Sequence, residues 1–307
     1  MKEKILPLKD AIARFVVADS SVVLGAVLEP DVPFAATHEI IRQGIKGLNV
    51  IAPISDASTD MLIGAGCCNE VTGAWVGNVS GGLGHNYRRA FEASDTATVK
   101  LHDHSNFSIA MALMAGAYGM PYAPMRSILG SDISKSNPDM MITENPFSED
   151  KEPIILVPPL VPDVAIIVVQ RADVFGNNHH WGSRGVVQEA ALAAENVIVL
   201  ANEIVEPAVI ASDPSRVLVP GYLVSAVCHV PAASHPSPQT GCWKRDNTFF
   251  GDYHAESRTV EGFDKWLQEW IFGVEDHAAY CQKLGSQLED LRITGSNLAA
   301  PTNYAAG

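Results

Sequence analysis

The chain has 307 residues, of which 47% are hydrophobic and 18% charged, and this balance predicts a well-packed globular protein rather than a disordered one. Its formal charge of −14 argues against nucleic acid or an anionic membrane as a partner, because both require concentrated Lys and Arg. A local site for an anionic small molecule stays compatible with this charge.

The first half of the chain alternates short helical and strand-like segments. Helices are expected over 8–17, 34–43, 59–64, 87–93 and 107–118, and strands over 21–28, 48–52, 71–76 and 99–101. This alternation is typical of an α/β fold with an open, mostly parallel sheet and helices on both faces.

The second half opens with a loop-rich stretch, 125–150, and then returns to the same pattern. Buried strands are expected over 154–157, 164–169, 197–201 and 223–230, with a helix over 186–195. Prolines interrupt the apolar run 154–169, which is too short to span a bilayer, so we expect no membrane segment.

The C-terminal part begins with an irregular stretch, 231–252. A helix with one apolar stripe is expected over 260–272 and a last helix over 276–284, which together form a C-terminal helical segment. We expect a single domain over residues 1–307, with a flexible tail from about residue 293 to 307.

Two features bear on the compartment. The start, Met1–Pro7, is charged and lacks an apolar core, so no signal peptide is expected. The five cysteines are odd in number and irregularly spaced, and none forms a C-x-x-C pair. We therefore expect reduced thiols in a cytoplasmic protein.

The glycine-rich stretch Val79–Gly84 is the strongest local signal of a site. Glycines let the backbone approach a ligand and direct N–H groups at negative charge, and Ser80 adds a hydroxyl. The stretch departs from the dinucleotide and P-loop motifs, because Tyr87 stands at the place of the third glycine and no Gly-Lys-Ser/Thr follows. Ser80 is also out of register for a nucleophile elbow, which favours a polar contact to a bound acyl group.

No nucleophile or metal site stands out beside this stretch. The histidines that cluster lack a familiar ligand spacing, so no metal is expected and loop histidines with hydrogen-bond roles are favoured. They are His102 with His104, His179 with His180, and His229 with His235. Glu70 and Glu144 could each attack a thioester, but neither is followed by glycine, and structural roles are favoured for both.

Short segments in collinear order resemble the A (alpha) subunit of family I coenzyme A transferases, of the glutaconate CoA-transferase type. The resemblance covers about residues 8–291. The segments are 8–13, 39–45, 60–64, 119–124, 144–147, 162–167, 181–182, 220–221, 233–237 and 269–272.

This resemblance implies a subunit of a two-subunit enzyme that moves CoA between carboxylic acids. In the family the catalytic Glu lies on the B (beta) subunit, so no catalytic residue is expected on this chain, and the A (alpha) subunit lends loops to a shared site. The implied partners are the B subunit, an acyl-CoA and a small carboxylic acid, with coenzyme A as a substrate and no permanently bound cofactor. The substrate-binding residues are expected to be Ser80, Gly81, Gly82, Gly25, Asn106 and Ser131.

Alternatives share this scaffold. The family's Gly-Gly-Phe run after the first strand is replaced by Leu24–Leu28. A related hydrolase branch carries a catalytic Glu just before the helix that starts near Phe107, where this chain has Asn106, which argues against hydrolysis. A decarboxylase, whose nucleophile differs on the partner chain, and a non-catalytic ligand-sensing domain stay open.

Overall fold

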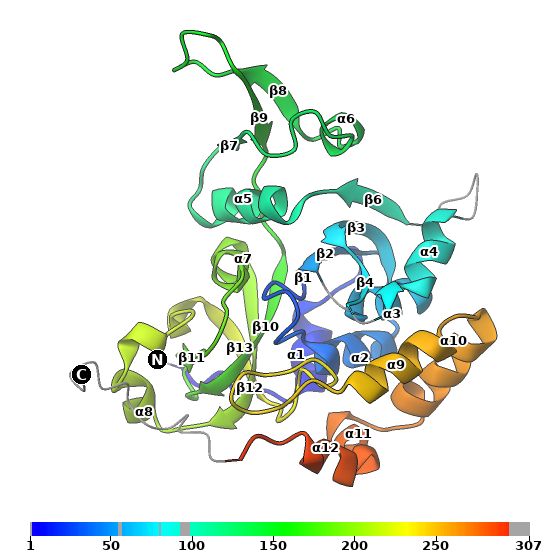
Figure 1. The fold of residues 1–307 in the computed structure, drawn as a ribbon. Helices are drawn as coiled ribbons and strands as arrows, with labels where there is room; N and C mark the ends of the chain where they lie inside the picture. The colour runs from blue at the N-terminus through cyan, green and yellow to red at the C-terminus, as the bar shows by residue number, and fades with distance from the viewer. Residues whose placement is uncertain (1, 55–56, 80, 93–98, 295–307) are drawn as a thin grey trace.

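The computed structural model describes residues 2–54, 57–79, 81–92 and 99–294, and its central feature is an open sheet (Figure 1). The sheet order is β13-β12-β10-β1-β2-β3-β6, and all neighbours on this path are parallel. β11 (Asn178–His179) pairs antiparallel with β10. The strands on the parallel path are β1 (Ser21–Val23), β2 (Leu48–Ile54), β3 (Cys68–Trp75), β6 (Lys100–Asp103), β10 (Val164–Ala172), β12 (Asn196–Ile204) and β13 (Val224–His229).

Helices cover both faces of this sheet, as the alternating sequence pattern predicts (Figure 1). α1 (Leu8–Phe15), α2 (Phe34–Gln43) and α3 (Ser58–Gly64) pack on one face, and α5 (Asn106–Ala117) and α7 (Val187–Ala193) on the other. β10 is buried on both sides, so Ile166 and Val168 join the first core and Ile167 joins the second. Both layers are needed because a parallel strand has no solvent face.

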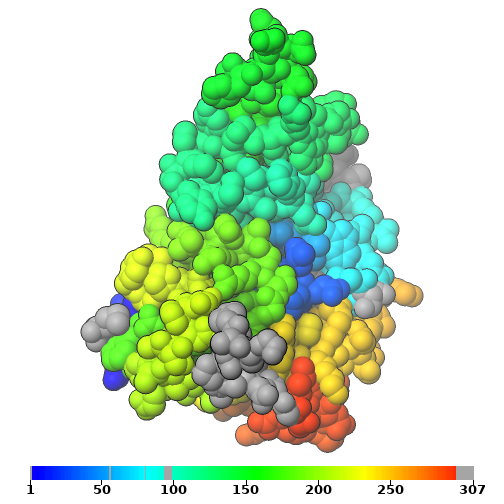
Figure 2. All heavy atoms as spheres, turned by 60° about the vertical axis from the view of Figure 1, so that its left-hand side comes forward, coloured from blue at the N-terminus to red at the C-terminus, as the bar shows by residue number. Residues whose placement is uncertain are grey.

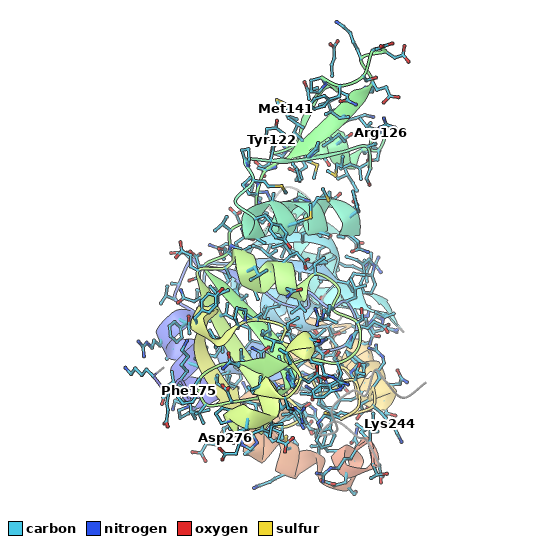
Figure 3. All side chains as sticks on the ribbon, turned by 90° about the vertical axis from the view of Figure 1, so that its left-hand side faces the viewer. Tyr122, Arg126, Met141, Phe175, Lys244 and Asp276 are labelled. Carbon is cyan, nitrogen blue, oxygen red and sulfur yellow. The ribbon has the colours of Figure 1, made fainter. Side chains whose placement is uncertain are left out.

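A second, three-stranded antiparallel sheet projects beyond α5. Its order is β7-β9-β8, formed by Ala123–Met125, Pro153–Val157 and Met141–Glu144, and the short helix α6 (Ile133–Ser136) lies beside it. Ala112 and Ala115 of α5 pack against Ile155 and Val157. Figure 2 shows this part as a narrow tip above the broader body. Figure 3 places Tyr122 and Met141 on it, and both side chains are exposed.

The C-terminal helices thicken the layer that contains α1–α3. They are α9 (Asn247–Glu256), α10 (Val260–Leu267) with a π-helical turn over Gln268–Phe272, α11 (His277–Leu284) and α12 (Ser286–Asp290). Their buried aromatic rings meet edge-to-face, for example Phe249 with Trp266 and Tyr253 with Trp266 at centroid distances of 4.9 and 5.3 Å. Such pairs add to the stabilisation from burial. α4 (His85–Glu92) and α8 (Pro207–Ala211) complete the elements used below.

Three sequence predictions need correction. The strand expected over 21–28 ends at Val23, because Gly25 takes a φ of 64° and turns the chain. The stretch 125–150 is mostly loop, as predicted, and the short elements α6 and β8 interrupt it. The irregular stretch 231–252 contains the start of α9, and α12 follows the helix expected to be last. The predicted tail lies outside the described residues from position 295 on.

Two smaller predictions can be compared directly. Within the ranges that the structure describes, no helix is long and apolar enough to cross a membrane. All five cysteines carry free thiols, as the irregular spacing predicts.

Candidate functional site

The carboxyl ends of the parallel strands define the edge where a ligand is expected. The strand order reverses between β1 and β10, and open α/β sheets bind ligands at such a switch point. Here the segment that follows β13 fills the end of β10. Gln239 Nε2 donates to the Val169 carbonyl at 3.1 Å, and Gln170 Nε2 donates to the Thr240 carbonyl at 3.1 Å. The loops after β3 and β6 are therefore the better candidates at this edge.

The glycine-rich stretch forms a small hairpin directly after β3. β4 (Gly77–Asn78) pairs antiparallel with β5 (Gly82–Leu83), and the Gly81 N–H donates to the Asn78 carbonyl at 2.9 Å. Gly82 has a φ of 106°, a conformation that favours glycine. Gly81 and Gly82 are exposed, so the turn leaves backbone accessible at this edge of the sheet. Ser80, the predicted polar contact, lies outside the described residues.

The hairpin rests on α9. Asn78 Nδ2 donates to the Phe250 carbonyl at 2.8 Å. A Cβ added at Gly81 would lie 2.9 Å from Cγ of His254, which is closer than real side chains approach. Packing against His254 therefore favours glycine at position 81.

A buried carboxylate anchors the residues after the hairpin. Asp60 accepts hydrogen bonds from Tyr253 Oη at 2.6 Å, Asn86 Nδ2 at 3.1 Å and the Tyr87 N–H at 2.7 Å. Burial raises the pKa of Asp60, and these hydrogen bonds oppose that rise. The helices α3, α4 and α9 therefore meet around the side chain of Asp60. A Cβ added at Gly84 would lie 2.2 Å from Asp60 Oδ1, so this position has no room for a side chain.

The other predicted binding residues divide into two groups. Gly25 is a buried turn residue after β1, and Asn106 is the exposed first residue of α5, directly behind the capping residue Ser105. Both therefore lie at the same sheet edge as the hairpin. Ser131 is used by a turn, because its Oγ donates to the Ile128 carbonyl at 2.7 Å. The loop before α6 belongs to the projecting part, and α5 separates that part from the hairpin (Figure 1).

The two glutamates weighed as nucleophiles lie away from the hairpin. Glu70 is in the first half of β3, and its carboxylate is 2.8 Å from Nε2 of His102. Glu144 ends β8 in the projecting sheet and forms an ion pair with Lys151 at 3.4 Å. The segment after it is a turn in which the Phe147 N–H donates to Asn145 Oδ1 at 3.0 Å. Both positions agree with structural roles.

The thiols and histidines also have structural surroundings. Burial raises the pKa of Cys228 and Cys242 to about 12, so both remain protonated thiols at neutral pH. His179 and His180 turn to different partners, the Ile210 carbonyl and Asp31. In the part of the chain that the structure describes, no three His, Cys, Asp or Glu side chains are grouped to hold a metal ion.

A separate pocket lies at the carboxyl end of β13, at the other end of the strand order from β3 and β6. It has a volume of about 550 Å³, and its lining includes Asp10, Glu39, Glu275 and Asp276. The lining also includes Lys9, but carboxylates outnumber it, and a negative lining disfavours the carboxylate and phosphate groups of the acyl-CoA that the resemblance implies. The charge of this pocket therefore favours the hairpin as the candidate site.

Sequence reasoning missed the residues that hold the hairpin in place. Asp60, Phe250 and His254 come from α3 and α9, and the bond between Asn78 and Phe250 joins residues 172 positions apart. Local patterns carry no information on a contact of that separation. The glycine at position 84, directly after the hairpin, was the one local signal that another side chain, here Asp60, lies close to the backbone.

Three comparisons bear on this arrangement. The family model described as Coenzyme A transferase matches residues 6–229. The A chain of the 3-oxoadipate CoA-transferase of Pseudomonas knackmussii is 38% identical over 281 residues, which cover 92% of this chain and 98% of that protein. The corresponding chain of the glutaconate CoA-transferase of Acidaminococcus fermentans is 34% identical over 94% of this chain and 95% of that protein. A crystal structure of the glutaconate enzyme matches with a TM-score of 0.90 and 31% identity, over 99% of this chain and 100% of that one.

Proposed function

Because the chain belongs to the coenzyme A transferase family, we propose that it is the alpha-type component of a heteromeric acyl-CoA:carboxylate CoA-transferase whose B subunit supplies the catalytic Glu. In this proposal the hairpin turn, with Ser80, Gly81 and Gly82, lines the acyl site. Gly25 and Asn106 contribute from neighbouring loops at the same sheet edge. Coenzyme A is a substrate that enters and leaves.

The observation that carries the proposal is an exposed glycine turn that, within the described residues, has neither Glu70 nor Glu144 beside it as a nucleophile. The turn presents exposed backbone at the end of β3, and backbone N–H groups are suited to an oxyanion. Glu70 and Glu144 are both engaged elsewhere. A nucleophile from a second chain completes such a site.

The surface supports a partner as well. The projecting sheet exposes large apolar side chains, and clusters of this kind mark interaction surfaces. They include Tyr122, Met141, Ile142 and Phe147. The relatives, which are named as single subunits of larger enzymes, are consistent with this interpretation.

The chemistry proceeds by two exchanges. The partner's Glu carboxylate attacks the acyl-CoA thioester, and the CoA thiolate leaves to give an acyl-glutamyl anhydride. The thiolate then attacks the glutamyl carbonyl, which forms glutamyl-CoA and releases the first acid as its carboxylate. A second carboxylic acid takes the CoA by the same steps in reverse. The turn stabilises the oxyanion formed at each attack.

The relatives favour a short dicarboxylic acid as the acceptor or donor. 3-Oxoadipate and glutaconate, which the names of the two relatives contain, both carry two carboxyl groups. We extend this class of acid to the present chain.

Reconstitution tests the proposal. The chain is co-expressed with a B-type subunit, and CoA exchange is measured between an acyl-CoA and a free carboxylic acid. The complex should exchange CoA, the chain alone should not, and borohydride should reduce a Glu on the B subunit during turnover. Full exchange by the chain alone, or net hydrolysis in place of exchange, would refute the proposal.

A further inference from the structure

A cationic pocket lies beside the hairpin, between α4 and the end of α9. It has a volume of about 480 Å³ and is lined by His85, Arg88, Arg89, Glu92 and Arg258. Three arginines thus face a single carboxylate, on a chain whose net charge is −14. Such an excess of positive charge in a concave site attracts an anionic ligand.

The cations of this pocket are unequally engaged. Arg89 donates to the carbonyls of Ser257 and Arg258, both at 3.0 Å, so its role includes holding the α9 end against α4. Arg88 Nε donates to Glu92 at 2.9 Å, in a pair that is at least half exposed and therefore weak. The guanidinium of Arg258 makes no hydrogen bond or ion pair within the described residues.

His85 adds an unused polar atom. Its Nε2 is buried without a hydrogen-bond partner in the described part of the chain. Desolvation lowers the pKa of His85, and the charges of His254 and the three arginines lower it further. A neutral imidazole can offer an N–H to an anion, as a donor that adds to the arginines.

The pocket is next to the turn proposed to hold the acyl group. The His85 ring lies 4.3 Å from the His254 ring, centroid to centroid, and His254 in turn packs against Gly81. Two imidazoles therefore separate the turn from the cations. A small dicarboxylic acid carries its second carboxylate within a few bonds of the reacting one, whereas the phosphates of CoA are removed from its thioester by the whole pantetheine arm.

We infer that the pocket formed by His85, Arg88 and Arg258 binds the distal carboxylate of a short dicarboxylic acid whose other carboxyl group reacts at the hairpin turn. This inference rests on the proposed function for the reacting end of the acid. Arg258 is the principal ligand, because it is not engaged within the described residues, and Arg88 is the second.

Arg258→Gln in the two-subunit complex tests the assignment. Glutarate and pentanoate have the same chain length and differ by the distal carboxylate. The substitution should raise the KM for glutarate roughly ten- to a hundredfold, as expected for a lost charged hydrogen bond. The KM values for pentanoate and for the acyl-CoA donor should stay unchanged. Arg14→Gln, an exposed arginine at the end of α1, is the matched control and should change none of the three.

A direct binding measurement separates this inference from the proposed function. Calorimetric titration of the complex with glutarate needs no turnover, and Arg258→Gln should weaken glutarate binding by the same factor. If no acid accepts CoA but glutarate binding still depends on Arg258, the function fails and the pocket assignment stands. If CoA transfer proceeds and Arg258→Gln leaves glutarate KM and binding unchanged, the assignment is wrong. A selective rise in the KM for acyl-CoA would overturn it too, because the pocket would then hold a phosphate.

Discussion

Gly84→Ala tests whether the Asp60 cluster stabilises the fold around the hairpin that is proposed as the acyl site. The new Cβ would lie 2.2 Å from Oδ1, 2.5 Å from Cγ and 2.9 Å from Cβ of Asp60. Asp60 is fully buried and cannot move without loss of its bonds to Tyr253, Asn86 or the Tyr87 N–H. The substitution therefore strains three elements at once.

The size of the effect follows from those bonds. A hydrogen bond to a charged group contributes about 1.5–3 kcal/mol, so the loss of one or two predicts a decrease of about 2–5 kcal/mol in the free energy of unfolding. Urea unfolding, followed by circular dichroism, measures this decrease as a shift of the midpoint at constant slope.

Gly251→Ala is the matched control for the same cluster. Gly251 lies within α9, and a Cβ there would have no heavy atom within 4 Å. Alanine is the better helix former, so this variant should be more stable by about 0.5–1 kcal/mol. A Gly84→Ala variant within about 0.5 kcal/mol of the wild type, or equal shifts for the two variants, would refute the reasoning.

Three further outcomes are expected. Desolvation and the neighbouring His102 lower the pKa of His104 from 6.5 to about 4, so between these pH values the unfolded chain binds a proton that the folded chain excludes. The free energy of unfolding should therefore fall as pH decreases from 6.5 toward 4, by up to about 1.4 kcal/mol per pH unit. Urea midpoints across this range should depend less steeply on pH in His104→Gln, and an equal dependence would contradict the assignment. Gly81→Ala should reduce the rate of CoA exchange at least about tenfold, because the new Cβ would lie 2.9 Å from Cγ of His254. The double variant with His254→Ala should recover part of that rate in the same assay, and no recovery would argue against this contact as the cause. The thiols of Cys228 and Cys242, with pKa values of about 12, should react with a disulfide reagent only on unfolding, and rapid labelling of the native protein would contradict their burial.

Much of the central sheet could be predicted from local pattern. α2 begins and ends at the residues that the apolar period and Gly44 indicate, because a left-handed glycine ends a helix through its own backbone geometry. The buried strands β10 and β12 are read from continuous runs of β-branched residues. The hairpin was recognised as a tight turn from its glycines alone.

The projecting sheet could not be predicted in this way. β7 and β8 are short, and both pair with β9, which the sequence indicates as a buried strand but assigns no partner. The hydrogen bonds between these strands link segments on either side of a loop-rich stretch, in which apolar residues recur with no clear strand or helix spacing. The structure places Ser131 in the projecting part, on the far side of α5 from the hairpin (Figure 1), and local pattern does not indicate this placement.

The sequence by itself determined the family and the alternation that makes a parallel sheet, and it predicted a ligand site at the glycine-rich stretch 79–84. Only the tertiary structure decided what stands around that turn. Asp60 lies in α3, His254 in α9 and Arg258 in the turn after α9, and long-range packing alone brings α9 against the hairpin. Local residue preferences fix backbone conformation within a few positions, whereas the charge and shape of a site depend on which distant side chains the buried core brings together.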